Sequence, residues 1–354
     1  MIHLAHGNLL TAKADALVNT VNTMGAMGKG IALQFKKAFP ENYAAYVKAC
    51  KAGEVQVGRM FVTESTRLDG PRFLINFPTK KHWRFPSSMA FIEQGLAALV
   101  QEVRARGIRS IAIPPLGCGL GGLPWAEVKA RIEDAFADLP DVDVYLYAPA
   151  GAPDAATMPN RTSRPKLTHA RAAFLGAVDH YQKLVFIDDP SLLEVQKIAY
   201  FLQEVGEPMK LKYQKWTYGP YADNLRHVLA ELDGHYLTGW GDGANKPGQK
   251  IVILQETLPQ VEGVLEQAPE TKARFDRVAA LVEGFESPYG MELLGTAHWV
   301  IKHELPPGEE PTVRSVAPRV QDWTQRKANL FSEDDIGVAL EHLKEHGLAG
   351  TPSA

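Results

Sequence analysis

The hydrophobic period of this chain changes once, on either side of a proline-rich segment. Residues 149–166 hold four prolines and no Leu, Ile, Val or aromatic residue, which is typical of a linker because such a segment can bury almost nothing. Before it, short apolar strands alternate with amphipathic helices, and after it apolar residues recur at helical spacing. The pattern predicts an α/β domain over residues 1–150, a linker over 151–167 and a mostly helical domain over 168–354.

The expected elements follow from the same periodicities, and the α/β alternation places helices on both faces of one sheet. In the first domain we expect strands at Ile2–His6, Ala16–Asn19, Val57–Thr63, Phe73–Phe77, Ser110–Pro114 and Val142–Tyr147, and helices at Gly30–Ala38, Glu41–Lys51, Ser87–Arg106 and Trp125–Asp138. In the second we expect helices at Ala170–Tyr181, Leu192–Val205, Ala222–Leu232, Thr271–Phe285, Met291–Ile301 and Ser332–His346, with short strands at His235–Thr238 and Ile251–Leu254.

The net charge of −3 conceals an uneven distribution. Residues 1–150 hold 17 Lys and Arg against 13 Asp and Glu, a net charge of +4. Residues 168–354 hold 18 against 27, a net charge of −9. Such asymmetry indicates a different kind of partner for each half.

Composition excludes several classes of site. Two cysteines, Cys50 and Cys118, can build neither a disulfide framework nor a four-cysteine zinc site, and no metal or cofactor is expected. His342 and His346 lie four residues apart, but without a HExxH pattern or a third ligand a solvated helix face is favoured over a metal site. No apolar run approaches the roughly 18 residues of a membrane helix, and the first residues lack a signal-peptide pattern, so we expect a cytoplasmic protein with no membrane partner.

Two glycine-rich loops each follow an apolar strand and precede a helix. The first lies within residues 18–32, holds three glycines and is not a Walker A loop, because the GxxxxGK[ST] spacing is absent. The second, Gly117–Gly122, satisfies G-x-G-x-x-G but lies too late in the domain for a dinucleotide fingerprint. Backbone amides and helix N-termini would converge there, so the pair of loops suggests a diphosphate held from both sides. The alternative is that the glycines serve only tight turns.

Lys80 follows the near-continuous apolar run Phe73–Phe77, and the expected strand ends at Pro78. Ligands of open α/β sheets bind at the carboxyl ends of the strands, where this lysine is expected. A partly desolvated lysine loses pKa and becomes a nucleophile or a base. The alternative reading is that Lys80 and Lys81 are solvated loop charges.

Three motifs together carry a resemblance: NTVNTMGAMGKGIA at 19–32, FPTKKHW at 77–83 and PLGCGLGGLPW at 115–125. They resemble the macrodomains of DarG-type antitoxins from DarTG toxin–antitoxin systems, and they are also similar to protein-directed ADP-ribose glycohydrolases. The resemblance covers essentially all of residues 1–150. It implies a macrodomain, an α/β fold with a mixed sheet sandwiched between helices. It also implies that the chain removes ADP-ribose from a DNA base, typically thymine in single-stranded DNA, after a DarT-type ADP-ribosyltransferase toxin has attached it.

The resemblance also implies roles for particular residues. Lys80 matches the catalytic lysine, with Thr79 beside it in the ligand site. Asn8 and Leu9 would contact adenine, although many macrodomains have Asp at the first position; Thr20, Val21 and Asn22 would line the distal ribose; Gly28, Gly30 and Ile31 would bind the diphosphate from one side, and Gly117, Cys118, Gly119, Leu120 and Gly121 from the other.

One position departs from the family pattern. Protein-directed relatives carry an aspartate where this chain has Gly121, and ordinary glycosidases use two carboxylates, of which the three motifs contain none. The remaining hypothesis is that Lys80 alone attacks or stabilises the anomeric carbon, or acts as a base, with a thymine anion leaving. Cys118 could be a nucleophile, but a small packing residue is favoured.

Residues next to Lys80 are candidates for contact with the nucleic acid. His82 and Trp83 could stack on an unpaired base, or Trp83 could instead cover the sheet edge. Lys29, Lys81 and Arg84 could contact DNA phosphates, although such a charge excess is also normal for a surface.

The second domain shows no recognisable set of catalytic residues. KLVFI at 183–187 and KWTYGPY at 215–221 resemble the helical antitoxin domain called SocA-like or Panacea, which implies capture of the DarT toxin. A DNA-binding toxin presents a basic groove, so acidic residues of this domain could mimic DNA phosphates; alternatively, the acidity serves solubility. Residues 240–248 are expected to form a surface loop. The alternative functions are a glycohydrolase for ADP-ribosylated proteins and a non-catalytic ADP-ribose-binding module.

Overall fold

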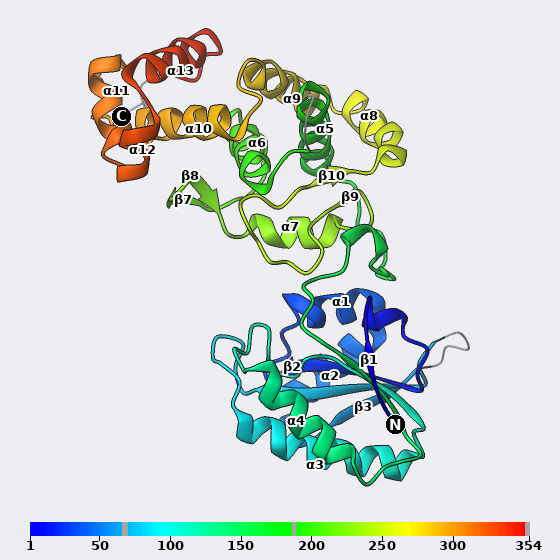
Figure 1. The fold of residues 1–354 in the computed structure, drawn as a ribbon. Coiled ribbons are helices and arrows are strands. Elements are labelled where there is room, and N and C mark those ends of the chain that lie inside the picture. Colours follow the sequence, from blue (N-terminus) through cyan, green and yellow to red (C-terminus); the bar gives the residue numbers. More distant parts are fainter. Residues whose placement is uncertain (66–69, 186–188, 351–354) are drawn as a thin grey trace. The chain divides into compact units, whose positions relative to one another are not determined.

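The computed structural model describes residues 1–65, 70–185 and 189–350. The chain divides into two compact units (Figure 1). Unit 1 comprises Met1–Ser163 with Gly241–Ala244, and unit 2 comprises Arg164–Trp240 with the rest of the chain from Asn245. Part of the loop that we expected on the surface of the second domain is therefore grouped with unit 1. The segment expected as linker contains a short 3-10 helix, η2 (Ala155–Thr157).

A six-stranded mixed sheet forms the centre of unit 1 over the described residues. Its order is β1-β6-β5-β2-β4-β3, in which β3 alone runs antiparallel to its neighbour. The carboxyl ends of β2, β4 and β5 therefore meet at one edge of the sheet. The strands are β1 (Ile2–Ala5), β2 (Ala16–Asn22), β3 (Phe61–Glu64), β4 (Phe73–Lys80), β5 (Ser110–Ile113) and β6 (Asp143–Tyr147).

Two strands differ from their predicted bounds for physical reasons. The strand expected at Val57–Thr63 begins only at Phe61, because Gly58 adopts a φ of +78° within a turn. Strand β4 does not end before Pro78 but continues to Lys80. Strand β3 pairs with β4 only as far as Asn76, so the missing N–H of Pro78 breaks no ladder on that side.

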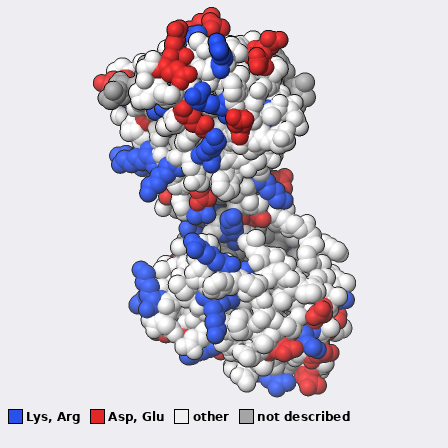
Figure 2. Space-filling view, turned by 90° about the vertical axis from the view of Figure 1, so that its left-hand side faces the viewer, with Lys and Arg blue, Asp and Glu red and all other residues white. Residues whose placement is uncertain are grey.

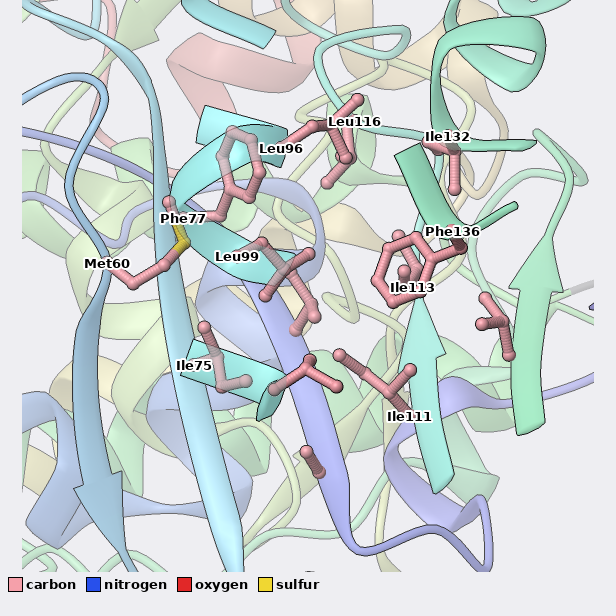
Figure 3. Close-up of a cluster of buried hydrophobic side chains, with 14 of the residues drawn as sticks. Met60, Ile75, Phe77, Leu96, Leu99, Ile111, Ile113, Leu116, Ile132 and Phe136 are labelled. Carbon is pink, nitrogen blue, oxygen red and sulfur yellow. The ribbon is translucent and has the colours of Figure 1, made fainter. Parts of the chain in front are cut away.

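Helices cover both faces of the sheet, which confirms the predicted fold class. Alternate residues of β4 point to opposite sides: Ile75 and Phe77 join the cluster formed with α3 and α4 (Figure 3), whereas Leu74 packs with α1. The Tyr46 and Ala49 side chains of α2 form a third cluster with Val21. The helices are α1 (Gly30–Ala38), α2 (Pro40–Lys51), α3 (Met89–Arg106) and α4 (Trp125–Phe136), with the 3-10 helix η1 at Leu9–Thr11.

Unit 2 is mostly helical, as predicted. Three of its helices, α8, α11 and α12, were not expected, and the start of the helix predicted at Ala222–Leu232 belongs instead to a hairpin strand. None of the described helices is both long and apolar enough to cross a membrane. The helices are α5 (His169–Leu184), α6 (Leu192–Glu204), α7 (Leu225–Leu232), α8 (Leu258–Glu266), α9 (Pro269–Val282), α10 (Pro288–His303), α11 (Val313–Gln321), α12 (Gln325–Leu330) and α13 (Glu333–Glu345), and the strands are β7 (Tyr213–Trp216), β8 (Gly219–Ala222), β9 (Leu237–Thr238) and β10 (Val252–Ile253), with the 3-10 helix η3 at Gln255–Thr257.

Candidate active site

Three loops meet at the carboxyl edge of the unit 1 sheet. They follow β2, β4 and β5, and they carry the three motifs that sequence analysis selected. Strand pairing sets Asn22 opposite Lys80. The Thr23 hydroxyl donates to the Lys81 carbonyl over 2.7 Å, and the Lys80 Nζ donates to the Leu120 carbonyl. Hydrogen bonds thus tie the three loops together around Lys80.

The Lys80 ammonium is half-buried and has a neutral partner. Its hydrogen bond goes to a backbone carbonyl, and burial lowers the pKa of Lys80 below its ordinary 10.5. Desolvation penalises the charged form of an amine, so a larger fraction of Lys80 is neutral than for a solvated lysine. This is the protonation behaviour that a nucleophile or general base requires.

The loop after β5 is closely packed at Gly121. A Cβ built there would lie 2.1 Å from the Gly117 carbonyl oxygen and 2.5 Å from the Ser87 hydroxyl, so this conformation leaves no room for a side chain. The Ser87 N–H also donates to the Gly121 carbonyl over 3.0 Å. In this conformation the loop therefore accommodates glycine and no larger residue at position 121. Sequence reasoning missed Ser87, which lies 34 positions from Gly121 and carries no motif.

Backbone amides of this loop point to anion binding. The N–H groups of Gly117, Gly119, Leu120 and Gly121 donate to no acceptor among the described residues. A run of unpaired amides forms a concave site for an anion. The Cys118 N–H differs, because it donates to the Pro115 carbonyl over 3.1 Å.

The surroundings of the Cys118 side chain favour the neutral thiol. Its Sγ lies 3.5 Å from the Leu116 carbonyl oxygen, and burial raises the pKa of the thiol to about 11. The thiolate, not the thiol, is the nucleophilic form. The geometry favours the packing role that sequence analysis preferred.

The loop after β2 is held by the side chain of Asn22. Its Oδ1 accepts from the Met24 N–H over 2.9 Å, and its Nδ2 donates to the Ala26 carbonyl over 2.6 Å. The Tyr46 hydroxyl donates to the Asn22 carbonyl over 2.5 Å. Asn22 therefore shapes the loop with the same atoms that would bind a ribose hydroxyl. Tyr46, on α2, gave no signal in the sequence.

The other residues expected around the ribose and diphosphate lie in or beside this loop. Thr20 is half-buried, whereas Val21 and Thr79 are buried side by side, with the Thr79 hydroxyl 3.5 Å from the Val21 carbonyl. Gly28 and Ile31 have N–H groups that donate to no acceptor among the described residues.

Gly30 opens α1 with a φ of +60°. Its N–H donates to the Asp242 carbonyl over 2.6 Å, within unit 1. Of the amides expected on this side of the diphosphate, this one already has an acceptor in the structure.

Asn8 and Leu9 differ in what they offer a ligand. The Asn8 Oδ1 caps the 3-10 helix η1 by accepting from the Leu10 N–H over 3.0 Å, which leaves its buried Nδ2 without a partner among the described residues. A buried amide donor without a partner is costly unless a ligand or water satisfies it. The Leu9 side chain is buried in the core next to α1.

A network of buried amides lies behind the site. Asn76, on β4, is fully buried and accepts from the Asn19 amide over 3.0 Å. Its own Nδ2 donates to the Asn42 side chain over 2.8 Å, and Asn42 accepts in turn from the Thr63 hydroxyl. This network joins β2, β3, β4 and α2, and sequence reasoning did not find it.

Among the described residues, one group could hold a metal ion: His342, Glu345 and His346, whose ligand atoms lie within 4.8 Å of one another. The two histidines are half-buried rather than a solvated helix face, which corrects that expectation. The His342 ring bonds the Leu281 carbonyl at 2.8 Å, and the His346 ring bonds the His342 carbonyl at 2.9 Å. Both rings thus have a structural role at the end of α13.

The KWTYGPY motif of unit 2 forms the β7–β8 hairpin, with Trp216 exposed near its turn. Two residues of the other motif, Phe186 and Ile187, lie outside the described residues. The hairpin covers Lys197, a fully buried lysine that donates to the Pro220 carbonyl over 2.9 Å.

Comparison with known proteins identifies the class. The Macro domain family model matches residues 18–132. A "DNA ADP-ribosyl glycohydrolase" of Thermus aquaticus is 47% identical over 348 residues, covering 98% of this chain and 94% of the relative. A "DNA ADP-ribosyl transferase-DNA ADP-ribosyl glycohydrolase fusion protein" of Thermosipho africanus is 34% identical over 163 residues, covering 42% of each. The solved macrodomain of Mycobacterium tuberculosis DarG is 56% identical, covers 42% of this chain and 99% of its own, and has a TM-score of 0.42.

The mixed sheet, the glycine loops and the family match define a macrodomain. Its curated relatives place it in the class of macrodomain enzymes that hydrolyse ADP-ribose linkages, the ADP-ribosyl glycohydrolases. More specifically, near-full-length identity of 47% shows that the chain belongs to the DNA ADP-ribosyl glycohydrolase family.

Proposed function

We propose that this protein releases ADP-ribose from a modified base of single-stranded DNA, with thymine as the base, in the cytoplasm. We further propose that its second unit binds the DarT-type transferase toxin that makes the modification. The observation that carries the first part is a half-buried lysine with a lowered pKa at the meeting point of two amide-lined loops. The fusion of transferase and glycohydrolase in the Thermosipho relative supports the second.

ADP-ribose would lie along the carboxyl edge of the sheet. The unpaired Asn8 Nδ2 offers a donor to the adenine ring, with the Leu9 amide beside it. Thr20, Val21 and Asn22 would border the distal ribose, with Thr79 beneath it. The unpaired amides would bind the diphosphate from two sides, namely Gly28 and Ile31 on one and Gly117, Gly119, Leu120 and Gly121 on the other, with Gly30 and Cys118 holding the two loops.

Lys80 would act at the anomeric carbon in one of two ways. As a nucleophile, Nζ bonds to that carbon while its bond to the thymine nitrogen breaks; the thymine anion takes a proton from solvent, and water then displaces the lysine. As a base, Lys80 removes a proton from the water that attacks the carbon; the bond from that carbon to the thymine nitrogen breaks with its electron pair on thymine, and the proton passes from Lys80 to thymine. Both routes consume one water and yield ADP-ribose and the unmodified base. Neither uses a carboxylate, and Gly121 leaves no room for one.

The test uses purified full-length protein with an ADP-ribosylated single-stranded oligonucleotide and with an ADP-ribosylated protein. We expect release from the oligonucleotide and loss of that release in Lys80→Ala, while the variant still binds ADP-ribose in calorimetry. Near wild-type release by Lys80→Ala would contradict the assignment. Release from the protein substrate alone would favour the protein-directed alternative, and binding without release would favour a non-catalytic module. Borohydride would distinguish the nucleophile from the base, because the sugar ring of a lysine adduct can open to an imine, which borohydride reduces to a stable amine.

Charge supports toxin binding by unit 2. Residues 168–354, most of which belong to unit 2, carry a net charge of −9, and a protein that binds DNA must offer a basic surface. Lys and Arg are mixed with Asp and Glu on the face of unit 2 that Figure 2 displays, so the acidic excess is not one continuous patch there. We propose that acidic side chains of this unit occupy the DNA-binding groove of the toxin.

Binding of the full-length chain to the purified toxin, measured across a range of salt concentrations, tests this proposal. We expect affinity to fall steeply with salt and a single-stranded oligonucleotide to compete for the toxin. Affinity that does not change with salt would contradict mimicry of DNA.

A further inference from the structure

Exposed apolar side chains lie on the loops that meet at Lys80. Within unit 1, four large hydrophobic residues on the loops around this lysine are exposed, and such a group on a soluble protein marks a binding site. The loops that carry them are joined by the Thr23–Lys81 and Lys80–Leu120 hydrogen bonds, so the four residues belong to one rim. The exposed fractions are 58% for Met24, 49% for Trp83, 63% for Phe85 and 71% for Leu120.

The three rings of the segment His82–Phe85 already lie against one another, with one stacked pair and one tilted pair. The His82 and Trp83 rings are stacked, with centroids 5.3 Å apart and 25° between their planes. The Phe85 ring lies 5.3 Å from His82, and the Arg84 guanidinium lies 4.7 Å from the Trp83 centroid. The His82 Nδ1 accepts from the Arg84 N–H over 3.1 Å, which fixes the turn. A preformed aromatic platform loses little side-chain entropy when another ring is added to it.

The charge of this rim suits a nucleic acid. Lys29, Lys81 and Arg84 are exposed, and the sequence holds no Asp or Glu between Gly70 and Ile92. Trp83 is 49% exposed, so part of its ring is accessible to a base. Aromatic rings next to cations are the arrangement by which proteins bind single strands through base stacking and phosphate contacts.

We propose that His82–Phe85 forms a second subsite, whose rings stack on the unpaired base adjacent to the ADP-ribosylated one. This proposal rests on the proposed function. Lys80 would lie at the anomeric carbon, where the sugar joins the base. The modified base and its strand would therefore lie beside Lys80, next to the segment that directly follows it in the chain. Arg84 and Lys81 would contact the phosphates of the same strand.

The experiment compares two substrates of the full-length protein: an ADP-ribosylated oligonucleotide with nucleotides on both sides of the modification, and the ADP-ribosylated mononucleoside. Trp83→Ala is expected to lower kcat/KM about 10- to 100-fold on the oligonucleotide and less than about twofold on the mononucleoside. Trp83→Phe keeps an aromatic ring and is expected to restore most of the loss. Leu4→Ala, which truncates an exposed apolar residue on the far edge strand β1, is the matched control.

A second measurement does not depend on hydrolysis. Fluorescence anisotropy with an unmodified single-stranded thymine oligonucleotide should show about tenfold weaker binding for Trp83→Ala and for Phe85→Ala than for Leu4→Ala. The subsite would be overturned if Trp83→Ala lowered kcat/KM equally on both substrates. It would also be overturned if this variant kept the wild-type kcat/KM on the oligonucleotide and the wild-type affinity in the anisotropy measurement. Failure of the proposed function looks different, because the wild-type protein would then release ADP-ribose from neither substrate, while the anisotropy would still decide whether the platform binds a strand.

Discussion

Lys80 donates a hydrogen bond to the carbonyl oxygen of Leu120, so the proposed catalytic amine is held by a neutral acceptor rather than by a carboxylate. The adjacent residue, Gly121, has no space for a side chain that could supply one. Desolvation of a partly buried amine that has no ion-pair partner lowers its pKa. The loop thus leaves no room for a carboxylate at position 121, and Lys80 is neutral in a larger fraction than a solvated lysine.

The pH dependence of the reaction should report this lysine. Burial lowers the pKa of Lys80 below 10.5, and the reactive form is the neutral amine, which gains population as the pH rises. We expect kcat/KM to rise with pH and to level off above the lowered pKa, short of the value for a solvated lysine. Lys80→Arg, which stays cationic, should abolish the activity and with it the rising limb. A rate that falls across the same range would contradict a neutral-lysine mechanism.

Substitution of Gly121 should damage the loop rather than add a function. In Gly121→Ala the new Cβ would lie 2.1 Å from the Gly117 carbonyl oxygen, and overpacking of this kind costs about 1–3 kcal/mol. Gly121→Asp should also fail to confer release from ADP-ribosylated protein. Hydrogen exchange of unit 1 peptides measures the cost. Gly119→Ala, whose Cβ would meet nothing within 4 Å, is the stability control and should leave exchange unchanged.

The buried amide network should be important for the stability of unit 1. Asn76→Ala removes the acceptor of Asn19 and the donor to Asn42 in a fully buried position. Each buried polar group left unpaired costs about 1–3 kcal/mol, so we expect a loss of about 2–4 kcal/mol in the free energy of unfolding. The predicted loss is measured by denaturant titration, with hydrogen exchange of β2 and β4 peptides as the signal for unit 1. An equal effect from Asn329→Ala, at an exposed position of α12, would show that the network contributes nothing specific.

Unit 2 should become more stable as the pH rises above neutrality. Burial, together with the charge of Lys327, lowers the pKa of Lys197 to about 7, whereas the unfolded chain keeps an ordinary lysine. Between about pH 7 and the unfolded value of about 10.4, the unfolded state binds more protons, so the free energy of unfolding rises with pH by up to about 1.4 kcal/mol per unit. Lys197→Met should remove this slope and stabilise unit 2 at neutral pH.

Hydrogen exchange of α6 peptides as a function of pH measures the slope. Lys212→Met, at an exposed position, is the matched control and should keep it. The same slope in Lys197→Met as in the wild-type protein would contradict the assignment to Lys197.

The sequence by itself determined most elements of unit 1 and the sheet edge at which Lys80 and the two glycine loops lie. Apolar periodicity is local, so helix α1 was predicted at its observed bounds and the sheet with helices on both faces was predicted from the alternation of strands and helices. Parallel strands end at a common edge, so the positions of Lys80 and of the two glycine loops after their strands were enough to predict that they meet.

Only the tertiary structure decided how these groups are used. Pro78 lies inside β4 because the neighbouring strand stops at Asn76, and Gly121 is required because Ser87 and the Gly117 carbonyl fill the space beside it. Likewise, the hydroxyl of Tyr46 holds Asn22 from a different helix. These constraints arise between segments far apart in the chain, so no local pattern of residues encodes them. The sequence therefore indicates which reactive groups are present. Long-range packing decides how much space the loops leave, which amide donors stay unpaired and how strongly Lys80 is desolvated.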